Sequence, residues 1–250
     1  MSGQLYLLPC PISEAPALDA LPASTVETAR RIDHFLVEAA RTARATLKAM
    51  GHPKPIAELD IVEIGHDPAP ELISEWLQPV LDGADAAVLS ESGCPGVADP
   101  GAQIAARAHE LGIRVVPLTG PSSILLTLMA SGLDGQRFRF SGYLPKHDAE
   151  RRAAILAAEK ASRASETQLF IETPYRNTAL LDALLETLAP DTRLTVAIDV
   201  TGQNESIRTL TAAAWKAIPK AMRTLPKLPT VFAFLAKPGK TARSEERRVG

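Results

Sequence analysis

Two short loops rich in glycine and proline carry residue types that suit the binding of a small molecule. Each follows an apolar stretch that predicts a strand: Ser92-Gly93-Cys94-Pro95 comes after the first, and Thr119-Gly120-Pro121-Ser122-Ser123 after the second. Glycine lets the backbone approach a ligand closely, and Ser or Thr adds a hydroxyl contact. Because ligands bind at the carboxyl ends of the strands in an open α/β sheet, both loops are predicted to line one cradle. Ordinary tight turns at the two glycines are the alternative interpretation.

Two acid–base pairs have a spacing that would let them handle a proton. Arg41 follows Glu38 by three residues, and Arg176 follows Glu172 by four. A carboxylate next to a guanidinium can act in acid–base catalysis, but it can equally form a structural ion pair of small energetic value. The residues alone do not assign a general base.

Several familiar catalytic signatures do not occur in the sequence. It contains no Gly-x-Gly-x-x-Gly, no lysine phosphate loop and no His-Glu-x-x-His, which argues against hydride transfer, nucleotide-driven phosphoryl transfer and zinc hydrolysis. The two cysteines, Cys10 and Cys94, each precede a proline at the predicted end of a strand. Two cysteines make neither a disulfide framework nor a zinc site, so we expect reduced thiols in tight turns near the cleft and no metal.

The composition describes a globular protein of one large or two compact domains. The chain has 250 residues, of which 46% are hydrophobic and 4% aromatic, so its cores should consist of Ala, Leu, Ile and Val. Its 27 basic and 29 acidic side chains give a net charge of -2, which provides no overall field to attract nucleic acid or an anionic membrane. Residues 1–11 lack a basic start, and no apolar run approaches the roughly 18 residues of a membrane span. The sequence therefore predicts a cytoplasmic protein.

The first half of the chain alternates between strand and helix patterns. Strands are predicted over residues 4–8, 34–38, 59–64, 85–90 and 113–118, and helices from Ser24, over 41–50, over 70–81 and from Asp99-Pro100 to Leu111. Ser24-Thr25-Val26-Glu27 has the spacing of a capping box. This alternation predicts a parallel sheet with helices on both faces.

The second half predicts a mixed sheet. Residues 124–130 are apolar around most of a helix, which we expect to be buried at a domain or subunit boundary. The domains are accordingly placed at residues 1–120 and 121–237, and the charged residues 238–250 are predicted to be a disordered tail. Some strands follow one another without a long helix between them, which favours a mixed sheet. The strands are predicted over 138–141, 168–172, 193–199, 206–210 and 230–235, with helices over 149–160, over 178–188 and around Trp215.

A series of motifs in fixed order resembles the tetrapyrrole methylase superfamily, the class III methyltransferases. In the first half these motifs are Leu5-Tyr6-Leu7-Leu8, Glu38-Ala39-Ala40-Arg41, Ser90 to Pro95, Ala98-Asp99-Pro100-Gly101 and Val115 to Ser123. The second half adds Ala130-Ser131-Gly132-Leu133, Gly142-Tyr143-Leu144-Pro145 and Phe170 to Arg176. These last motifs are most similar to the branch of small-subunit ribosomal RNA ribose 2′-O-methyltransferases. The resemblance covers residues 5–235.

The resemblance implies a homodimer of two α/β domains that binds S-adenosylmethionine in a cleft between them. Carried over by position, the cofactor contacts would be Pro11, Ser92, Gly93, Cys94, Pro95, Ser122, Ser123, Tyr143 and Leu144. Ser122 and Ser123 also suit the start of the following helix, and capping and cofactor contact can coexist. The candidate catalytic groups are Glu38, Arg41, Glu172 and Arg176.

Two motifs depart from the pattern of the RNA enzymes. Where these usually have Glu-Asp-Thr-Arg, this chain has Glu38-Ala39-Ala40-Arg41, which lacks an acid and a hydroxyl. Where they usually have Arg-Glu-Leu-Thr-Lys, this chain has Ile198-Asp199-Val200-Thr201-Gly202, which lacks two basic groups. These losses put a phosphate-binding or proton-relay role at both places in doubt.

Three functions therefore remain for this chain. The first is methyl transfer from S-adenosylmethionine to RNA, with a ribose hydroxyl as the acceptor. The second is methylation of a tetrapyrrole or another small molecule, and the third is a cofactor-binding protein without catalytic activity. Basic residues on the predicted surface are either solvated charges or a phosphate-binding patch; they are Arg41, Arg44 and Lys48 on one helix face, and Arg137, Arg139, Lys146, Arg151 and Arg152.

Overall fold

The computed structural model describes residues 2–14, 16–65 and 68–238, and the chain divides into two compact units. Unit 1 is Met1–Ser122 and unit 2 is Ser123–Gly250. The predicted tail, 238–250, lies outside the described residues except for Pro238. In the described part of the chain, none of the helices combines the length and the apolar character that a membrane span needs.

Unit 1 is built on a five-stranded parallel sheet. Its strands are β1 (Gln4–Leu8), β2 (His34–Val37), β3 (Asp60–Glu63), β4 (Ala86–Leu89) and β5 (Arg114–Pro117), in the order β3-β2-β4-β1-β5. Leu5 in the central region of the sheet pairs with Ala86 on one side and Val115 on the other. β2 and β4 are buried throughout, as expected for parallel strands covered on both faces.

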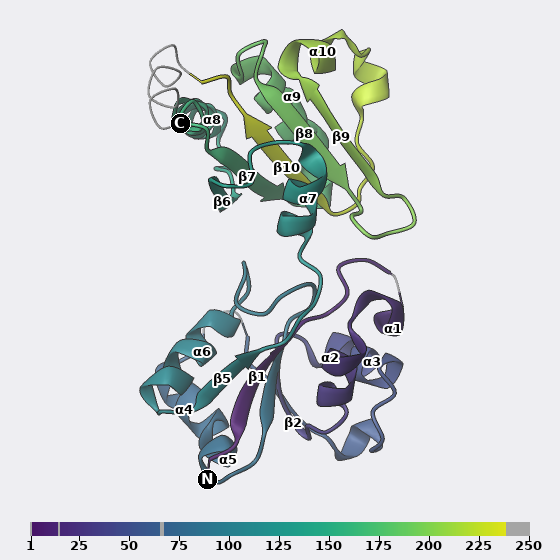
Figure 1. The fold of residues 1–250 in the computed structure, drawn as a ribbon, viewed down its shortest axis with the longest axis vertical. Coiled ribbons are helices and arrows are strands. Elements are labelled where there is room, and N and C mark those ends of the chain that lie inside the picture. Colours follow the sequence, from purple (N-terminus) through teal and green to yellow (C-terminus); the bar gives the residue numbers. More distant parts are fainter. Residues whose placement is uncertain (1, 15, 66–67, 239–250) are drawn as a thin grey trace, which may run out of the picture. The chain divides into compact units, whose positions relative to one another are not determined.

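Helices cover both faces of this sheet, as the sequence predicts (Figure 1). The first face carries α1 (Ala17–Ala20), α2 (Ala23–Ala29), α3 (Ala40–Ala49) and the short η1 (Ile56–Glu58). The other face carries α4 (Pro70–Trp76), α5 (Gln78–Leu81) and α6 (Gly101–Glu110). Each face has its own hydrophobic core, with Phe35 and Leu47 in the first and Ile104 and Leu77 in the second.

Two details of the predicted helices are wrong. α2 begins at Ala23 after Pro22 and has no side-chain cap, so the capping box predicted for Ser24 and Glu27 does not form. The Thr25 hydroxyl donates to the Thr119 carbonyl at 2.8 Å. The helix predicted over 70–81 is interrupted at Leu77, because Pro79 lacks a backbone N–H and its ring crowds the carbonyl four residues earlier.

Unit 2 contains the predicted mixed sheet, in the order β6-β7-β10-β8-β9. Its strands are β6 (Phe138–Tyr143), β7 (Thr167–Glu172), β8 (Arg193–Ile198), β9 (Ser206–Thr211) and β10 (Thr230–Leu235). β6 and β7 are parallel, whereas the other neighbouring pairs are antiparallel. This confirms the predicted fold class.

The helices of unit 2 are α7 (Ser123–Ser131), α8 (Asp148–Ser162), α9 (Asn177–Thr187) and α10 (Ala212–Ala217), with short turns η2 (Pro174–Arg176) and η3 (Lys220–Arg223). The side chains of α8, α9 and α10 share one core with Phe170, Phe232 and Phe234. Within unit 2, α7 is buried on one side only, since Leu125 is 50% and Met129 77% exposed. Only the stripe that includes Ile124 and Leu128 is buried, and α7 packs against β9 and β10.

The loops after β1 and β5 are in close contact at Gly120. An ideal Cβ atom at this position would lie 2.3 Å from Cγ of Pro9, which is closer than real side chains approach. The proline ring cannot rotate away, so glycine is required there for steric reasons.

We expect Gly120→Ala to destabilise unit 1 by about 1–3 kcal/mol, since the strained contact must push the two loops apart. Gly135→Ala is the control, because a Cβ atom at Gly135 would meet nothing within 4 Å. Urea unfolding measures both variants. Equal stability of the two variants would contradict the close contact.

Candidate functional site

The loops that follow β1 and β4 are joined by backbone hydrogen bonds. The N–H of Cys10 donates to the carbonyl of Gly93 at 2.9 Å, and the N–H of Gly93 donates to the carbonyl of Cys10 at 3.2 Å. Both loops lie at the carboxyl edge of the sheet, because β4 and β1 are parallel neighbours. This edge is where the sequence predicts the cradle.

Side chains next to this junction fix the shape of the loop after β4. The Ser90 hydroxyl donates to the Gly93 carbonyl at 2.9 Å, and the Cys10 thiol donates to the Ser90 carbonyl at 2.9 Å. Farther along, Oδ1 of Asp99 accepts from the N–H of Gly96 at 3.2 Å and of Gly101 at 2.9 Å. Gly93 has φ +75°, a backbone conformation that glycine adopts without strain.

Six predicted cofactor contacts lie in these loops of unit 1: Pro11, Ser92, Gly93, Cys94, Pro95 and Ser122. Ser92 is exposed, and Pro11, Cys94 and Ser122 are half-buried, so a ligand can reach them. Gly93 and Pro95 are buried and shape the loop. The loop after β5 is held by the bond from Thr25 to Thr119 and by a weak contact between the Cys94 thiol and the Pro121 carbonyl, at 3.5 Å.

Beside these loops, unit 1 has a pocket of about 380 Å³ that sequence analysis does not predict. Its walls are the start of the loop after β1, one side of α3, and Glu91 in the loop after β4. The Thr42 hydroxyl on α3 donates to Oε1 of Glu91 at 3.2 Å across this pocket. After β2 the chain crosses to β3 at one edge of the sheet, whereas after β4 it crosses to β5 at the opposite edge. A crevice between such strands is the usual ligand site of an open α/β sheet.

The predicted pair Glu38 and Arg41 stands at the start of α3. Glu38 is half-buried in the turn between β2 and the helix, and Arg41 is exposed and makes no ion pair with another described residue. The motif here has Ala39 as the N-cap, which offers no side-chain cap. A carboxylate from the neighbouring strand replaces it, since Oε1 of Glu63 accepts from the N–H of Ala40 at 2.6 Å. α3 is thereby capped without the acid and hydroxyl that the RNA enzymes usually carry.

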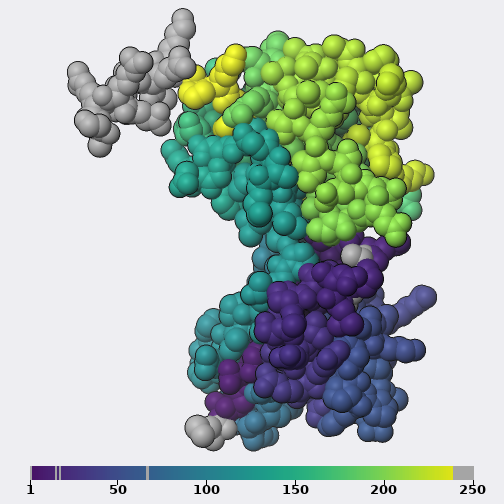
Figure 2. Space-filling view, turned by 45° about the vertical axis from the view of Figure 1, so that its right-hand side comes forward, coloured from purple at the N-terminus to yellow at the C-terminus, as the bar shows by residue number. Residues whose placement is uncertain are grey.

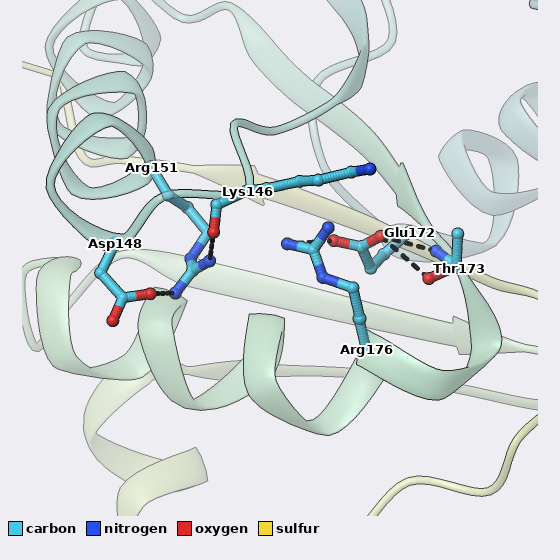
Figure 3. Close-up of polar contacts among 6 residues, drawn as sticks. All are labelled: Lys146, Asp148, Arg151, Glu172, Thr173 and Arg176. Atoms are coloured by element: carbon cyan, nitrogen blue, oxygen red, sulfur yellow. Dashed lines mark hydrogen bonds and ion pairs between the residues drawn. The ribbon is translucent and has the colours of Figure 1, made fainter.

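The predicted pair Glu172 and Arg176 does come together, in unit 2 (Figure 3). Oε2 of Glu172 lies 3.3 Å from the Arg176 guanidinium, and Oε1 accepts from the N–H of Thr173 at 2.7 Å. The carboxylate is buried at the end of β7, whereas Arg176 is partly exposed. Figure 3 also shows that the Arg151 guanidinium points away from this pair, to Asp148 and to the carbonyl of Lys146.

The remaining predicted cofactor contacts belong to unit 2. Ser123 is the first residue of α7, and Tyr143, 60% exposed, ends β6 after a bulge. Gly142, at φ +63°, supplies the left-handed residue in this irregularity. The Leu144 side chain packs in the core of unit 2, so its backbone is the part that a ligand can reach.

The second departure from the RNA enzymes forms a strained turn after β8. Asp199 and Thr201 have φ values of +48° and +68°, which are uncommon for residues with side chains. The Asp199 carboxylate accepts from the N–H of Asn204 at 2.9 Å, and it lies so close to Gly202 that a Cβ atom there would be 2.1 Å from its Oδ1. The acid therefore holds the turn together, and Gly202 makes room for it.

The environment of the two thiols keeps both of them protonated. Desolvation raises the pKa of Cys10 from 9.0 to about 12, against the opposing effect of a hydrogen bond with Thr46, while the charges of Asp99 and Glu91 raise it further. Desolvation also raises the pKa of Cys94. Both cysteines are free, and a protonated thiol is a poor nucleophile. In the described residues, no group of three or more His, Cys, Asp or Glu side chains is placed to hold a metal ion.

The raised pKa of Cys10 makes stability depend on alkaline pH. Its thiol stays protonated in the folded protein but ionises above pH 9.0 in the unfolded chain, so stability is lost as the pH rises from 9.0 toward about 12. We expect the free energy of unfolding to fall more steeply in the wild type than in Cys10→Ala, by up to about 1.4 kcal/mol per pH unit. Urea titrations between pH 8.5 and about 11 measure this difference, with the less buried Cys94→Ala as control. Parallel curves for wild type and Cys10→Ala would contradict it.

Comparison with known proteins places the chain among methylases. The family model of tetrapyrrole (corrin/porphyrin) methylases matches residues 17–215. Proteins named ribosomal RNA small subunit methyltransferase I are similar over much of the chain. The one from Mesorhizobium japonicum is 33% identical over 210 residues, 84% of this chain and 68% of its own length. The one from Neisseria meningitidis serogroup B is 29% identical over 201 residues, 80% of this chain and 65% of its own length. The chain thus spans about two thirds of the length of these relatives.

A solved structure shows the same fold. The uroporphyrin-III-C-methyltransferase from Thermus thermophilus matches with a TM-score of 0.54 and 18% identity, over 100% of this chain and 98% of that one. At this identity the likeness concerns the fold alone. The family model, the curated relatives and the fold agree with the resemblance drawn from the motifs. The chain belongs to the tetrapyrrole (corrin/porphyrin) methylase family.

Proposed function

We propose that this protein transfers the methyl group of S-adenosylmethionine to RNA, with a ribose hydroxyl of ribosomal RNA as the acceptor. Family membership supports the methyl transfer, and the names of the curated relatives support RNA. The observation on this chain that carries the choice of RNA is a basic stripe beside the loop edge of unit 1. The stripe consists of Arg41, Arg44 and Lys48 on α3.

The residues of the unit 1 loops fit the proposed cofactor. Gly93 has no side chain at the point where the loop after β4 turns. The neighbouring Ser92 exposes its hydroxyl. We assign cofactor contacts to Pro11, the loop 92–95 and Ser122 in unit 1, and to Ser123, Tyr143 and the backbone of Leu144 in unit 2. When bound, the cofactor supplies a methyl carbon on a sulfonium, which is reactive enough that the protein must chiefly orient the acceptor and exclude water.

The charged candidates then have positioning roles. The buried Glu172 carboxylate fixes the Arg176 guanidinium, whose exposed part can meet an anionic substrate. Glu38 and Arg41 stand where the basic stripe begins, so we assign Arg41 to phosphate and Glu38 to the support of that helix end. No role as general base is assigned to these four residues.

The basic stripe is suited to track a phosphate backbone. Arg41, Arg44 and Lys48 are all exposed, lie at i, i+3 and i+7, and make no ion pair with another described residue. Unpaired cations bind polyanions mainly by releasing counterions. In Figure 2 the N-terminal part of the chain, from purple to blue, forms most of the visible face of unit 1, with teal residues along its left side. In unit 2, Arg151 is held by Asp148 and so adds less to such a surface.

The proposal includes a homodimer located in the cytoplasm, as the resemblance implies. Methylation of a tetrapyrrole in the same site is the second candidate, in line with the name of the matching family of tetrapyrrole (corrin/porphyrin) methylases. A protein that binds the cofactor without catalysis is the third. These candidates differ in their dependence on salt and in which methyl acceptor becomes labelled.

We expect the triple variant Arg41→Gln, Arg44→Gln, Lys48→Gln to bind RNA more weakly. The slope of log affinity against log salt should fall by roughly 2–3, because each phosphate contact contributes about 0.7–0.9. Filter binding of small-subunit ribosomal RNA between about 50 and 200 mM salt measures the slope, and tritiated-methyl transfer to the same RNA measures activity. The matched control is Arg114→Gln, Lys160→Gln, Lys216→Gln, which removes the same charge from exposed positions.

If the slope of log affinity against log salt were unchanged in the α3 variant, the basic stripe would not be the site that binds the RNA phosphates. Transfer of label to a tetrapyrrole but not to RNA would favour the second candidate. Cofactor binding with no labelled acceptor in either pool would favour the third.

A further inference from the structure

Glu91 is the charged group that stands between the cofactor loops and the pocket of unit 1. It follows Ser90 in the loop after β4, directly before the proposed cofactor contacts Ser92 to Pro95. Its side chain is exposed and lines the pocket together with Cys10 and Pro11. The hydrogen bond from Thr42 at 3.2 Å fixes its carboxylate toward α3. A ligand in the pocket would therefore meet this carboxylate beside the cofactor loop.

The lining of the pocket selects against an acidic ligand. Glu14 and Glu91 bring carboxylates, and Ser13, Thr42 and Thr46 bring hydroxyls, whereas none of the described lining residues is Lys, Arg or His. The apolar part consists of small side chains, including Ala45 and Ala49. A tetrapyrrole with several carboxylates would be repelled here, because like charges close together are destabilising. A neutral group rich in hydroxyls would instead find acceptors for its O–H donors.

α3 places this pocket next to the basic stripe. Residues 42, 45, 46 and 49 face the pocket, and residues 41, 44 and 48 form the stripe. At 3.6 residues per turn the two sets lie about a third of a turn apart on the helix surface. A nucleotide presents the same contrast, since its sugar is neutral and carries hydroxyls while the phosphate beside it is anionic. One side of the helix thus borders the acidic pocket, and the adjacent side carries the basic stripe.

We infer that the pocket of unit 1 binds the ribose of the acceptor nucleotide, and that Glu91 is the general base that takes the proton of its 2′-hydroxyl. This inference rests on the proposed function. As the hydroxyl oxygen bonds to the methyl carbon, its proton moves to the Glu91 carboxylate, and the electron pair of the breaking carbon–sulfur bond stays on sulfur. Glu91 later releases the proton to water. Thr42 is a positioning residue, since it orients the carboxylate through one oxygen and leaves the other open to the substrate.

Other titratable groups near Glu91 line the pocket or lie beside it. Glu14 and the Cys10 thiol share its lining, Asp99 acts on the same thiol, and Arg41 and Arg44 belong to the adjacent stripe. Desolvation raises the pKa of Cys10 to about 12, so this thiol does not titrate in the acidic range. An acidic limb in the rate profile that depends on Glu91 would therefore report this carboxylate.

The first test measures single-turnover methyl transfer to small-subunit ribosomal RNA against pH. A general base contributes roughly 10²–10⁴-fold, so Glu91→Gln should transfer at least about 100-fold more slowly and lose the acidic limb, with unchanged binding of S-adenosylhomocysteine in calorimetry. Thr42→Val should slow transfer less and keep the limb. Glu75→Gln, an exposed acid on α4, is the matched control and should behave as wild type. A Glu91→Gln rate within threefold of wild type, with the acidic limb intact, would overturn the role of Glu91.

The second test measures binding alone, so it separates this inference from the proposed function. The methyl signals of Ala45 and Ala49 in NMR spectra report the pocket. We expect millimolar adenosine, guanosine, cytidine or uridine to shift them, the matching 2′-deoxynucleoside to bind at least about fivefold more weakly, and Glu91→Gln to lose this preference. Shifts with this preference but no RNA methylation would refute the proposed function and retain the ribose site. No shift with any nucleoside, or equal binding of both sugars, would overturn the ribose site.

Discussion

The two backbone hydrogen bonds between Cys10 and Gly93 are the constraint on which the functional edge of unit 1 depends. They tie the first loop of the sheet to the loop after β4, although about eighty residues separate these loops in the chain. Gly93 has a left-handed backbone at this junction, and the Ser90 hydroxyl and the Cys10 thiol support the junction by further hydrogen bonds. This connection thereby shapes the proposed cofactor loop, and its Cys10 also lines the pocket that contains Glu91.

The net charge of the chain is close to zero, but charged groups are unevenly distributed around α3. One side of the helix contributes hydroxyls and small side chains to an acidic pocket, and the adjacent side carries three cations that form no ion pair with another described residue. The loss of the usual acid and hydroxyl in Glu38-Ala39-Ala40-Arg41 does not weaken the start of this helix, since Glu63 from β3 supplies the cap. The altered motif therefore changes which residue caps the helix, but Arg41 keeps its position in the first turn.

Sequence reasoning recovered what depends on local pattern. Apolar runs such as residues 86–89 located the strands, and the spacing of strand and helix signals led to the parallel and mixed sheets. It failed where a distant partner decides. Ser24 and Glu27 have the spacing of a capping box, but the helix begins at Ala23 and the neighbouring Thr25 bonds to Thr119. The pocket could not be predicted, because it arises from α3, the loop after β1 and Glu91, whose proximity follows only from the strand order. A polar residue next to a predicted glycine loop was the one available signal for Glu91.

The central claim, that the carboxyl edge of unit 1 binds S-adenosylmethionine, is tested most directly by hydrogen–deuterium exchange with and without this compound. The account predicts slower exchange in residues 10–13, 91–97 and 119–123, and little change in α4 and α5 on the same unit. S-adenosylhomocysteine should protect the same segments, because it shares every part of the cofactor except the transferred methyl group. Saturating binding in calorimetry with no protection of these loops would contradict the account.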